Sequence, residues 1–99
     1  MYYLNLIEAY RNIIAIADED LVGKVFLEGD LQLDVKESFY KGELMNEEEI
    51  LTFCKNWIRE DATFNIVGPR AISLLKEAGF IDESSIKNLA GIPYSMILI

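Results

Sequence analysis

The sequence predicts an α+β fold: a mixed β-sheet with an N-terminal hairpin, covered on one face by two main helices and one short helix. Short β-prone runs recur from residues 2–7 to the last residues, and two stretches with helical spacing of apolar residues separate the later runs. The chain has 99 residues, of which 52% are hydrophobic and 26% charged, a composition typical of globular proteins. We therefore expect a single domain, residues 1–99.

The N-terminal hairpin is predicted from two apolar, β-prone runs at residues 2–7 and 12–17, which a short polar segment separates. The acidic segment 18–23 follows and predicts a short helical turn. Asp18 can cap the start of that turn, and Gly23 suits its end because glycine adopts the left-handed backbone conformation without strain.

Two further strands are predicted at residues 25–27 and 31–35, on either side of a turn at Glu28-Gly29-Asp30. Apolar and polar residues alternate in the second of them, which predicts a half-buried strand with one side in water. Its apolar side consists of Leu31, Leu33 and Val35.

The strongest helix signal begins at Asn46, which can cap a helix while Glu49 completes a capping box three residues later. The three glutamates 47–49 complement the helix dipole, so a solvated helix start explains them better than a metal or catalytic cluster does. Lys55 and Arg59 suit the C-terminal end of the helix. One apolar stripe at helical spacing is formed by Ile50, Phe53, Cys54, Trp57 and Ile58.

A second helix is predicted from Pro69 to about Ala78, because proline suits a first helical turn and the following apolar residues recur at helical spacing. Gly79 is the expected left-handed cap of this helix. Phe80 is then positioned to fold back on Leu75, as such caps prefer.

The C-terminal part predicts a short third helix that starts at Asp82 or Ser84, followed by a strand over residues 92–99. Pro93 belongs at the beginning of this strand because proline cannot donate to the ladder. Residues 97–99 are apolar without alternation, so we expect them to be covered on both faces. The cover would come from other parts of the chain or from a second subunit in a homodimer. Both ends of the chain are predicted to be ordered strands of the main sheet.

Missing residue types exclude several chemistries. The chain has no histidine, which rules out Ser-His-Asp and Cys-His catalysis and zinc sites that contain histidine. Its one cysteine, Cys54, can form no internal disulfide, and its place on an apolar helix face indicates a structural role. We expect no catalytic residues, no metal and no cofactor.

The charge balance limits the class of partner. The formal net charge of −8, from 17 acidic and 9 basic residues, opposes binding to bare nucleic acid and suits a basic protein partner. No apolar run approaches the ~20 residues of a membrane span, and the N-terminus lacks the basic start of a signal peptide. The sequence therefore predicts a cytoplasmic protein without membrane contact.

The strongest candidate site is the segment 68–71, where an apolar strand stops and a helix begins. Arg70 places a cation beside the positive end of the helix dipole, where acidic residues are preferred, so we expect an anion to neutralise it. A phosphate or carboxylate could be held by the backbone N–H groups of Arg70 and Ala71 and by the guanidinium. The candidate anion-binding residues are Gly68, Arg70, Ala71, Lys24 and Tyr40.

An internal carboxylate is preferred to a ligand as the partner of Arg70, because half-buried arginines usually pair within the protein. The expected partner is a residue such as Asp61, Glu37 or Glu43. One Gly-Pro-Arg helix start is also far short of a phosphate-loop motif, so the signal for a ligand is weak.

Five segments together form a recognisable pattern: Asp18-Glu19-Asp20-Leu21-Val22-Gly23-Lys24, Glu28-Gly29-Asp30-Leu31, Ser38-Phe39-Tyr40-Lys41-Gly42-Glu43, Asn65-Ile66-Val67-Gly68-Pro69-Arg70-Ala71 and Ala90-Gly91-Ile92-Pro93. In order and spacing they resemble the archaeal family catalogued as domain of unknown function 424. The resemblance implies an archaeal cytosolic protein, but no function, because the family is uncharacterised. In the family pattern a cysteine often stands where this chain has Ala17 and a histidine where it has Tyr94. A role that depends on either side chain could not operate here.

Three functions stay open from the sequence. A non-enzymatic protein-interaction module is favoured by the acidic surface, the half-exposed strand 31–35 and the lack of catalytic side chains. The resemblance makes translation or RNA-processing machinery its plausible setting. The first alternative is a domain or enzyme that binds an anionic small molecule at the Gly68-Pro69-Arg70 helix start. The second is RNA binding, with stacking platforms at Tyr2, Tyr3, Tyr40 or Tyr94.

Overall fold

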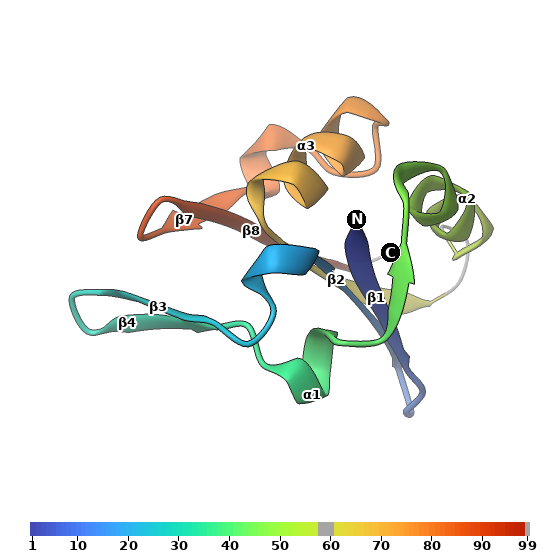
Figure 1. The fold of residues 1–99 in the computed structure, drawn as a ribbon. Coiled ribbons are helices and arrows are strands. Elements are labelled where there is room, and N and C mark those ends of the chain that lie inside the picture. Colours follow the sequence, from blue (N-terminus) through green and yellow to red (C-terminus); the bar gives the residue numbers. More distant parts are fainter. Residues whose placement is uncertain (58–60, 99) are drawn as a thin grey trace.

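Six strands form one mixed sheet in the computed structural model, which describes residues 1–57 and 61–98 (Figure 1). The strands are β1 (Tyr2–Ile7), β2 (Asn12–Asp18), β5 (Glu43–Met45), β6 (Ala62–Val67), β7 (Lys87–Leu89) and β8 (Ile92–Leu98). Their order across the sheet is β5-β1-β2-β6-β8-β7. The central pair, β2 and β6, is parallel, and each of the other neighbouring pairs is antiparallel. The predicted α+β fold with a mixed sheet and an N-terminal hairpin is confirmed.

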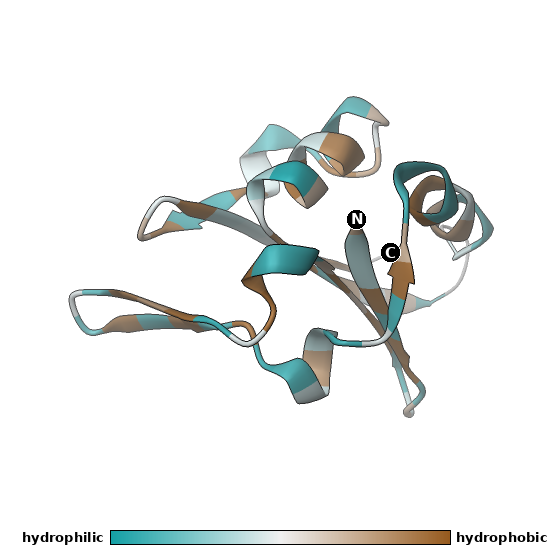
Figure 2. Ribbon diagram, viewed as in Figure 1, coloured by the Kyte–Doolittle hydropathy of each residue, from teal (hydrophilic) through white to brown (hydrophobic). Residues whose placement is uncertain are grey.

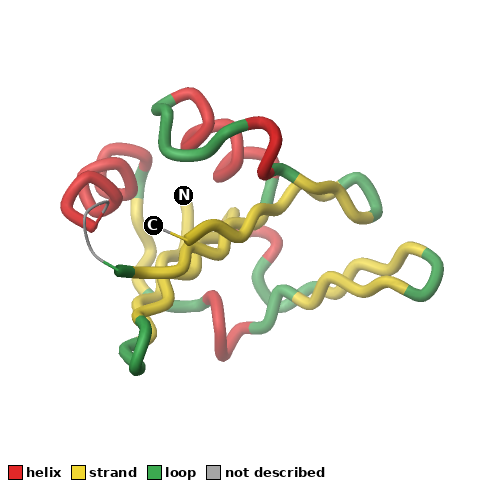
Figure 3. The backbone as a smooth tube through the Cα atoms, turned by 180° about the vertical axis from the view of Figure 1, so that it is seen from behind, coloured by secondary structure: helices red, strands yellow, loops and turns green. Residues whose placement is uncertain are grey.

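Helices cover one face of this sheet, and a separate two-stranded ribbon lies on the other side (Figures 1 and 3). The first face carries α2 (Glu47–Trp57), α3 (Pro69–Glu77) and the short η2 (Glu83–Ser85). The other side carries the turn η1 (Glu19–Leu21), the ribbon β3 (Val25–Glu28) and β4 (Leu31–Asp34), and the single-turn helix α1 (Glu37–Tyr40). The ribbon and the β7–β8 hairpin project side by side from the same end of the sheet (Figure 3).

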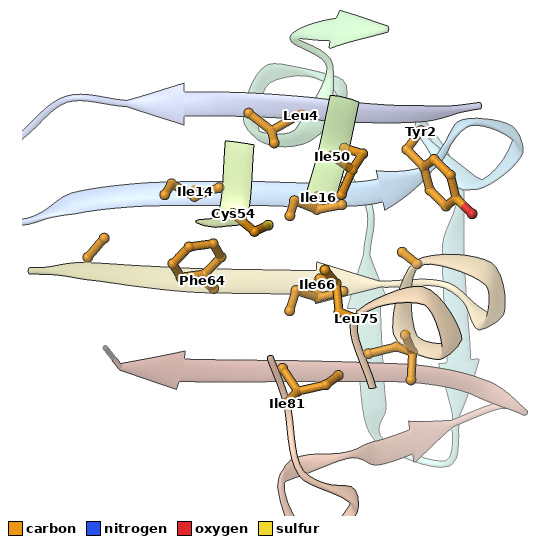
Figure 4. Close-up of a cluster of buried hydrophobic side chains, with 13 residues drawn as sticks. Tyr2, Leu4, Ile14, Ile16, Ile50, Cys54, Phe64, Ile66, Leu75 and Ile81 are labelled. Atoms are coloured by element: carbon orange, nitrogen blue, oxygen red, sulfur yellow. The ribbon is translucent and has the colours of Figure 1, made fainter. Parts of the chain in front are cut away.

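The larger core lies between the sheet and the two main helices (Figure 4). Strand register places its residues in rows that run across the sheet, because side chains two apart on a strand point to the same face. One row consists of Leu4, Ile16, Ile66 and Ser95, and the next of Leu6, Ile14, Phe64 and Ile97. The helices contribute chiefly Ile50, Cys54, Ala71, Ile72 and Leu75.

The smaller core lies on the opposite face and covers only part of it. Ala15, Ala17 and Val67 of the sheet pack there against Val35 and Tyr40, which follow the ribbon. The two small alanines leave room for these larger side chains to approach the sheet closely. The far end of this face, toward residue 98 of β8, has no such cover among the described residues.

Local sequence signals are confirmed at two helix ends. The Asn46 side chain accepts the Glu49 N–H at 2.9 Å, and the Asn46 N–H donates to the Glu49 carboxylate at 3.0 Å, which is the predicted capping box. At the end of α3, Gly79 has a φ of +83°, and the Phe80 N–H donates to the Leu75 carbonyl at 2.9 Å. This is the predicted left-handed cap.

Three predictions about local structure are wrong or incomplete. The short helix predicted after residue 82 ends at Ser85, and the chain then forms β7, because these residues pair with β8. Helix α1 and strand β5 were not predicted. Residues 92–98 form the predicted strand, but beyond Tyr94 only one of its faces is covered. Met96 and Leu98 are 69% and 71% exposed on the other face. The predicted roles of Ile58, Arg59 and Ile99 lie outside the described residues.

We expect the Cys54 thiol to be inert in the folded protein. It is buried on α2, and burial raises the pKa of the thiol to about 12, so at pH 8.5 the folded protein holds almost no reactive thiolate. The unfolded thiol has a pKa of about 8.5 and is half ionised at this pH. Iodoacetamide at pH 8.5 should therefore alkylate Cys54 only after unfolding in guanidinium, as mass spectrometry will show. Rapid labelling of the native protein would contradict the buried position.

Candidate functional site

The predicted site at residues 68–71 is organised around a buried carboxylate, that of Asp18 at the end of β2. One Asp18 oxygen accepts the backbone N–H of Arg70 at 3.0 Å, and the other accepts the N–H of Ala71 at 2.7 Å. These N–H groups belong to the first turn of α3, where no intrahelical acceptor exists. Asp18 makes no side-chain bond to the turn that follows it, so the prediction that it caps residues 18–23 is wrong. It caps α3 instead.

Gly68 allows this carboxylate to approach the helix start. The residue has a φ of +113°, which disfavours any side chain, and it is buried between β6 and α3. A Cβ at this position would lie 2.7 Å from both Asp18 oxygens. Pro69 follows at the first helical position, where its missing N–H needs no acceptor.

The Arg70 guanidinium lies beside two acidic residues of the same chain. Its Nε is 3.8 Å from an Asp18 oxygen, and its Nη2 is 3.4 Å from an Asp20 oxygen. Nη2 also donates to the Met1 carbonyl at 3.3 Å, and the guanidinium carbon lies 5.6 Å from the centre of the Tyr2 ring. The anion predicted for Arg70 is therefore present within the chain.

The particular partners predicted for Arg70 are wrong. Asp61 pairs with Arg11 at 2.6 Å, Glu37 lies beside Gly23, and Glu43 belongs to the edge strand β5. Asp18 and Asp20 are the partners instead, because the parallel pairing of β2 with β6 brings the end of β2 to the start of α3.

A pocket of about 330 Å³ opens beside Arg70, between the N-terminal end of β1 and the helices α2 and α3. The Arg70 side chain is 51% exposed, so part of the guanidinium is accessible from this pocket. Burial, followed by the nearby Glu47 carboxylate, raises the pKa of the Tyr2 hydroxyl, which also lines it. The remaining lining residues are Met1, Asn46, Ser73, Leu74 and Glu77.

Lys24 and Tyr40, the other two candidate residues, lie elsewhere. Lys24 is at the base of the β3–β4 ribbon, where its backbone bonds to Leu21 and Val35. Tyr40 is buried in the smaller core, and this burial raises the pKa of its hydroxyl. Tyr2 is also buried, so neither tyrosine presents a free ring face on which a base could stack.

An exposed apolar surface on the β3–β4 ribbon was missed from the sequence. Val25, Leu27 and Leu31 are 51%, 67% and 61% exposed. Alternation in residues 31–35 predicted Leu31 on the buried side together with Val35. The register places Leu31 opposite Glu28 at the ribbon tip, beyond the reach of the core. In the sequence, the only signal for this surface was the short turn between the runs 25–27 and 31–35, which permits a two-stranded ribbon that extends away from the sheet.

Two absences concern the described residues. Within them, no three acidic or cysteine side chains are grouped closely enough to ligate a metal ion. None of the helices in residues 1–57 and 61–98 combines the length and the hydropathy needed to cross a membrane.

Comparison with known proteins identifies relatives but no activity. A family model described as "Protein of unknown function (DUF424)" matches residues 7–99. The structure is similar to the crystal structure of an uncharacterized conserved protein from Methanopyrus kandleri, with a TM-score of 0.80 and 27% sequence identity. That similarity covers 99% of this chain and 90% of the other. No curated protein matches the chain.

We expect Asp18 to contribute far more to stability than the charges around it. Asp18→Ala leaves two N–H groups of the α3 start without an acceptor, so it should lower the free energy of unfolding by about 3 kcal/mol or more. Asp20→Ala and Arg70→Ala remove an exposed pair and should cost about 1 kcal/mol or less. Denaturant titration of the three variants measures this order. Equal losses in all three would contradict the capping role of Asp18.

Proposed function

The chain belongs to the DUF424 family, whose function is unknown, and we propose that it is a non-enzymatic protein-interaction module whose β3–β4 ribbon binds a basic surface of a partner protein. The observation that carries this proposal is the exposed apolar pair Val25 and Leu27 on the outward side of a projecting ribbon. Soluble proteins rarely leave neighbouring large apolar side chains in water unless a partner covers them.

Ribbon register separates a buried side from an outward side. Phe26 pairs with Leu33, and both pack against the smaller core. Val25 pairs with Asp34 and Leu27 with Gln32, so these four side chains share the opposite, outward side. Figure 2 shows hydrophobic stretches along both strands of the ribbon. The outward apolar residues are therefore not needed to hold the ribbon on the sheet.

The ribbon is held in place at both ends. At its base, the Gly23 N–H donates to the Val35 carbonyl at 2.7 Å, and the Val35 N–H donates to the Lys24 carbonyl at 2.9 Å. At its tip, Glu28 accepts the Ala90 N–H of the β7–β8 turn at 2.9 Å. A binding surface that is ordered beforehand loses less conformational entropy when a partner binds, which favours a contact role for this arm.

Charge indicates the chemistry of the partner. Glu28, Asp30 and Asp34 lie on the ribbon around its apolar residues, and the whole chain has a net charge of −8. A partner surface with an apolar centre and a basic rim would complement this arrangement. RNA-binding proteins carry such basic surfaces, which supports a place in translation or RNA-processing machinery.

The test begins with a photo-crosslinking amino acid at position 27, and at Thr52 on α2 as the control position. A protein that crosslinks in native lysate at position 27 but not at position 52 is then purified. The proposal expects Leu27→Glu to weaken binding of this protein at least about tenfold, which corresponds to about 1.4 kcal/mol. It also expects weaker binding at higher salt.

Leu44→Glu is the matched control, because Leu44 is an exposed leucine on the opposite sheet edge. Both variants should melt within a few degrees of the wild type, since exposed substitutions change stability by about 0.5 kcal/mol. If the Leu27→Glu variant binds the captured protein as tightly as the Leu44→Glu variant does, the ribbon is not the contact surface.

A second candidate function, binding of a small anion, is favoured by one observation: the half-exposed Arg70 guanidinium beside the 330 Å³ pocket. The carboxylates of Glu47 and Glu77 in the same pocket oppose it. Thermal-shift titration with inorganic phosphate and with acetate tests it. A stabilisation that Arg70→Ala abolishes would support the anion site. No shift, or the same shift in the variant, would exclude these anions as ligands.

A further inference from the structure

A second exposed apolar surface lies at the C-terminal part of β8, far across the sheet from Leu44 on the edge strand β5. Strand β6 pairs with β8 from Tyr94 to Leu98, whereas β7 pairs with it only from Ile92 to Tyr94. In Figure 4, β7 lies beside only the first part of β8. Among the described strands, none borders the outer edge of residues 95–98. The Ser95 hydroxyl donates to the Ser85 carbonyl of η2 at 2.9 Å, so η2 lies beside residue 95. The outward backbone groups of residues 96–98 are therefore the ones available to another strand.

The sheet face at this end is uncharged and presents exposed apolar side chains from β8. Met96 and Leu98 point to the face opposite α2 and α3 and are 69% and 71% exposed. The two rows that contain them have no charged residue. These rows are Asn5, Ala15, Asn65 and Met96, and Ile7, Ile13, Thr63 and Leu98. At the next positions on this face, beyond Ile13 and Thr63, Arg11 and Asp61 pair with each other at 2.6 Å.

Neutrality at this edge selects a second copy of the chain as the occupant. Two copies with a net charge of −8 each repel one another, so a contact between them costs least where the surface carries no charge. A basic segment of another protein would find no carboxylate in these two rows with which to pair. We propose that two copies pair antiparallel through the outer edges of β8, around a twofold axis at Ile97.

The axis position follows from the geometry of a sheet. Residues directly opposite each other in an antiparallel pair point to the same face. The twofold axis must therefore lie midway between the two copies of a single residue, so that this residue pairs with itself across the interface. With the axis at Ile97, Met96 of each copy lies opposite Leu98 of the other. These two exposed side chains then cover each other as a cross-strand pair. The interface is isologous, because one strand supplies both halves of each contact.

Cysteine crosslinking tests this register directly. Met96→Cys and Leu98→Cys are made as separate variants, oxidised alone and as a mixture, and analysed on non-reducing gels. In the proposed register, position 96 of one copy faces position 98 of the other. The distance between their Cα atoms then falls within the range of about 4.4–6.8 Å that a disulfide requires. The mixture should therefore form many more disulfide-linked dimers than either variant alone. Cys54 does not compete, because its thiol is buried with a pKa of about 12.

Sedimentation velocity provides the second readout. The wild type should form a dimer whose fraction grows with protein concentration, and Leu98→Glu should be monomeric with an unchanged melting temperature, because Leu98 is exposed in a single copy. Leu44→Glu, an exposed leucine on the other edge strand, should still dimerise. The proposal is overturned if the wild type stays monomeric and the mixed cysteine variants form no disulfide-linked dimer, which leaves the edge for a different protein segment. A dimer that survives Leu98→Glu also overturns it, because the interface would then lie elsewhere.

Discussion

The bond between the Asp18 carboxylate and the start of α3 is the interaction on which the arrangement of this fold most depends. It joins the end of β2 to residues more than fifty positions later, where the buried first turn of a helix needs acceptors. The same contact fixes the Gly68 backbone and brings Arg70 over Tyr2. A helix start of this kind ordinarily attracts an external anion. Here a side chain of the protein occupies that position, so the helix start serves stability first.

Unequal cover of the sheet determines which surfaces are left for binding. The helices protect one face along its length, whereas the other is protected only where Val35 and Tyr40 pack on the two alanines of β2. Among the described residues, exposed large apolar side chains occur in groups on the β3–β4 ribbon and at the end of β8. Neither place stabilises the isolated chain, and this is the physical reason to assign both to contacts with other molecules.

Sequence reasoning succeeded where the interaction is local. The Asn46–Glu49 capping box and the Leu75–Phe80 cap each involve residues only a few positions apart, so both could be predicted from the sequence. It identified that Arg70 needs an anion but chose the wrong carboxylates, because the parallel pairing of β2 with β6 decides which acidic residue arrives there. Likewise, β7 forms in place of a longer helix because of its pairing with β8. Leu31 is exposed although the alternation of residues 31–35 predicted it to be buried, because the pairing of β3 with β4 places it at the tip of the ribbon.

The two exposed surfaces differ in charge, which gives them different roles. Acidic residues surround the apolar side chains of the ribbon, whereas the end of β8 is neutral. Pairing two β8 edges around an axis perpendicular to the sheet keeps equivalent faces on the same side of the enlarged sheet. Both ribbons of such a dimer would therefore lie on one side. A partner with two basic sites could contact both at once, and the second contact would form at a high effective concentration. Dimerisation would thus strengthen a ribbon contact that is weak in a single copy.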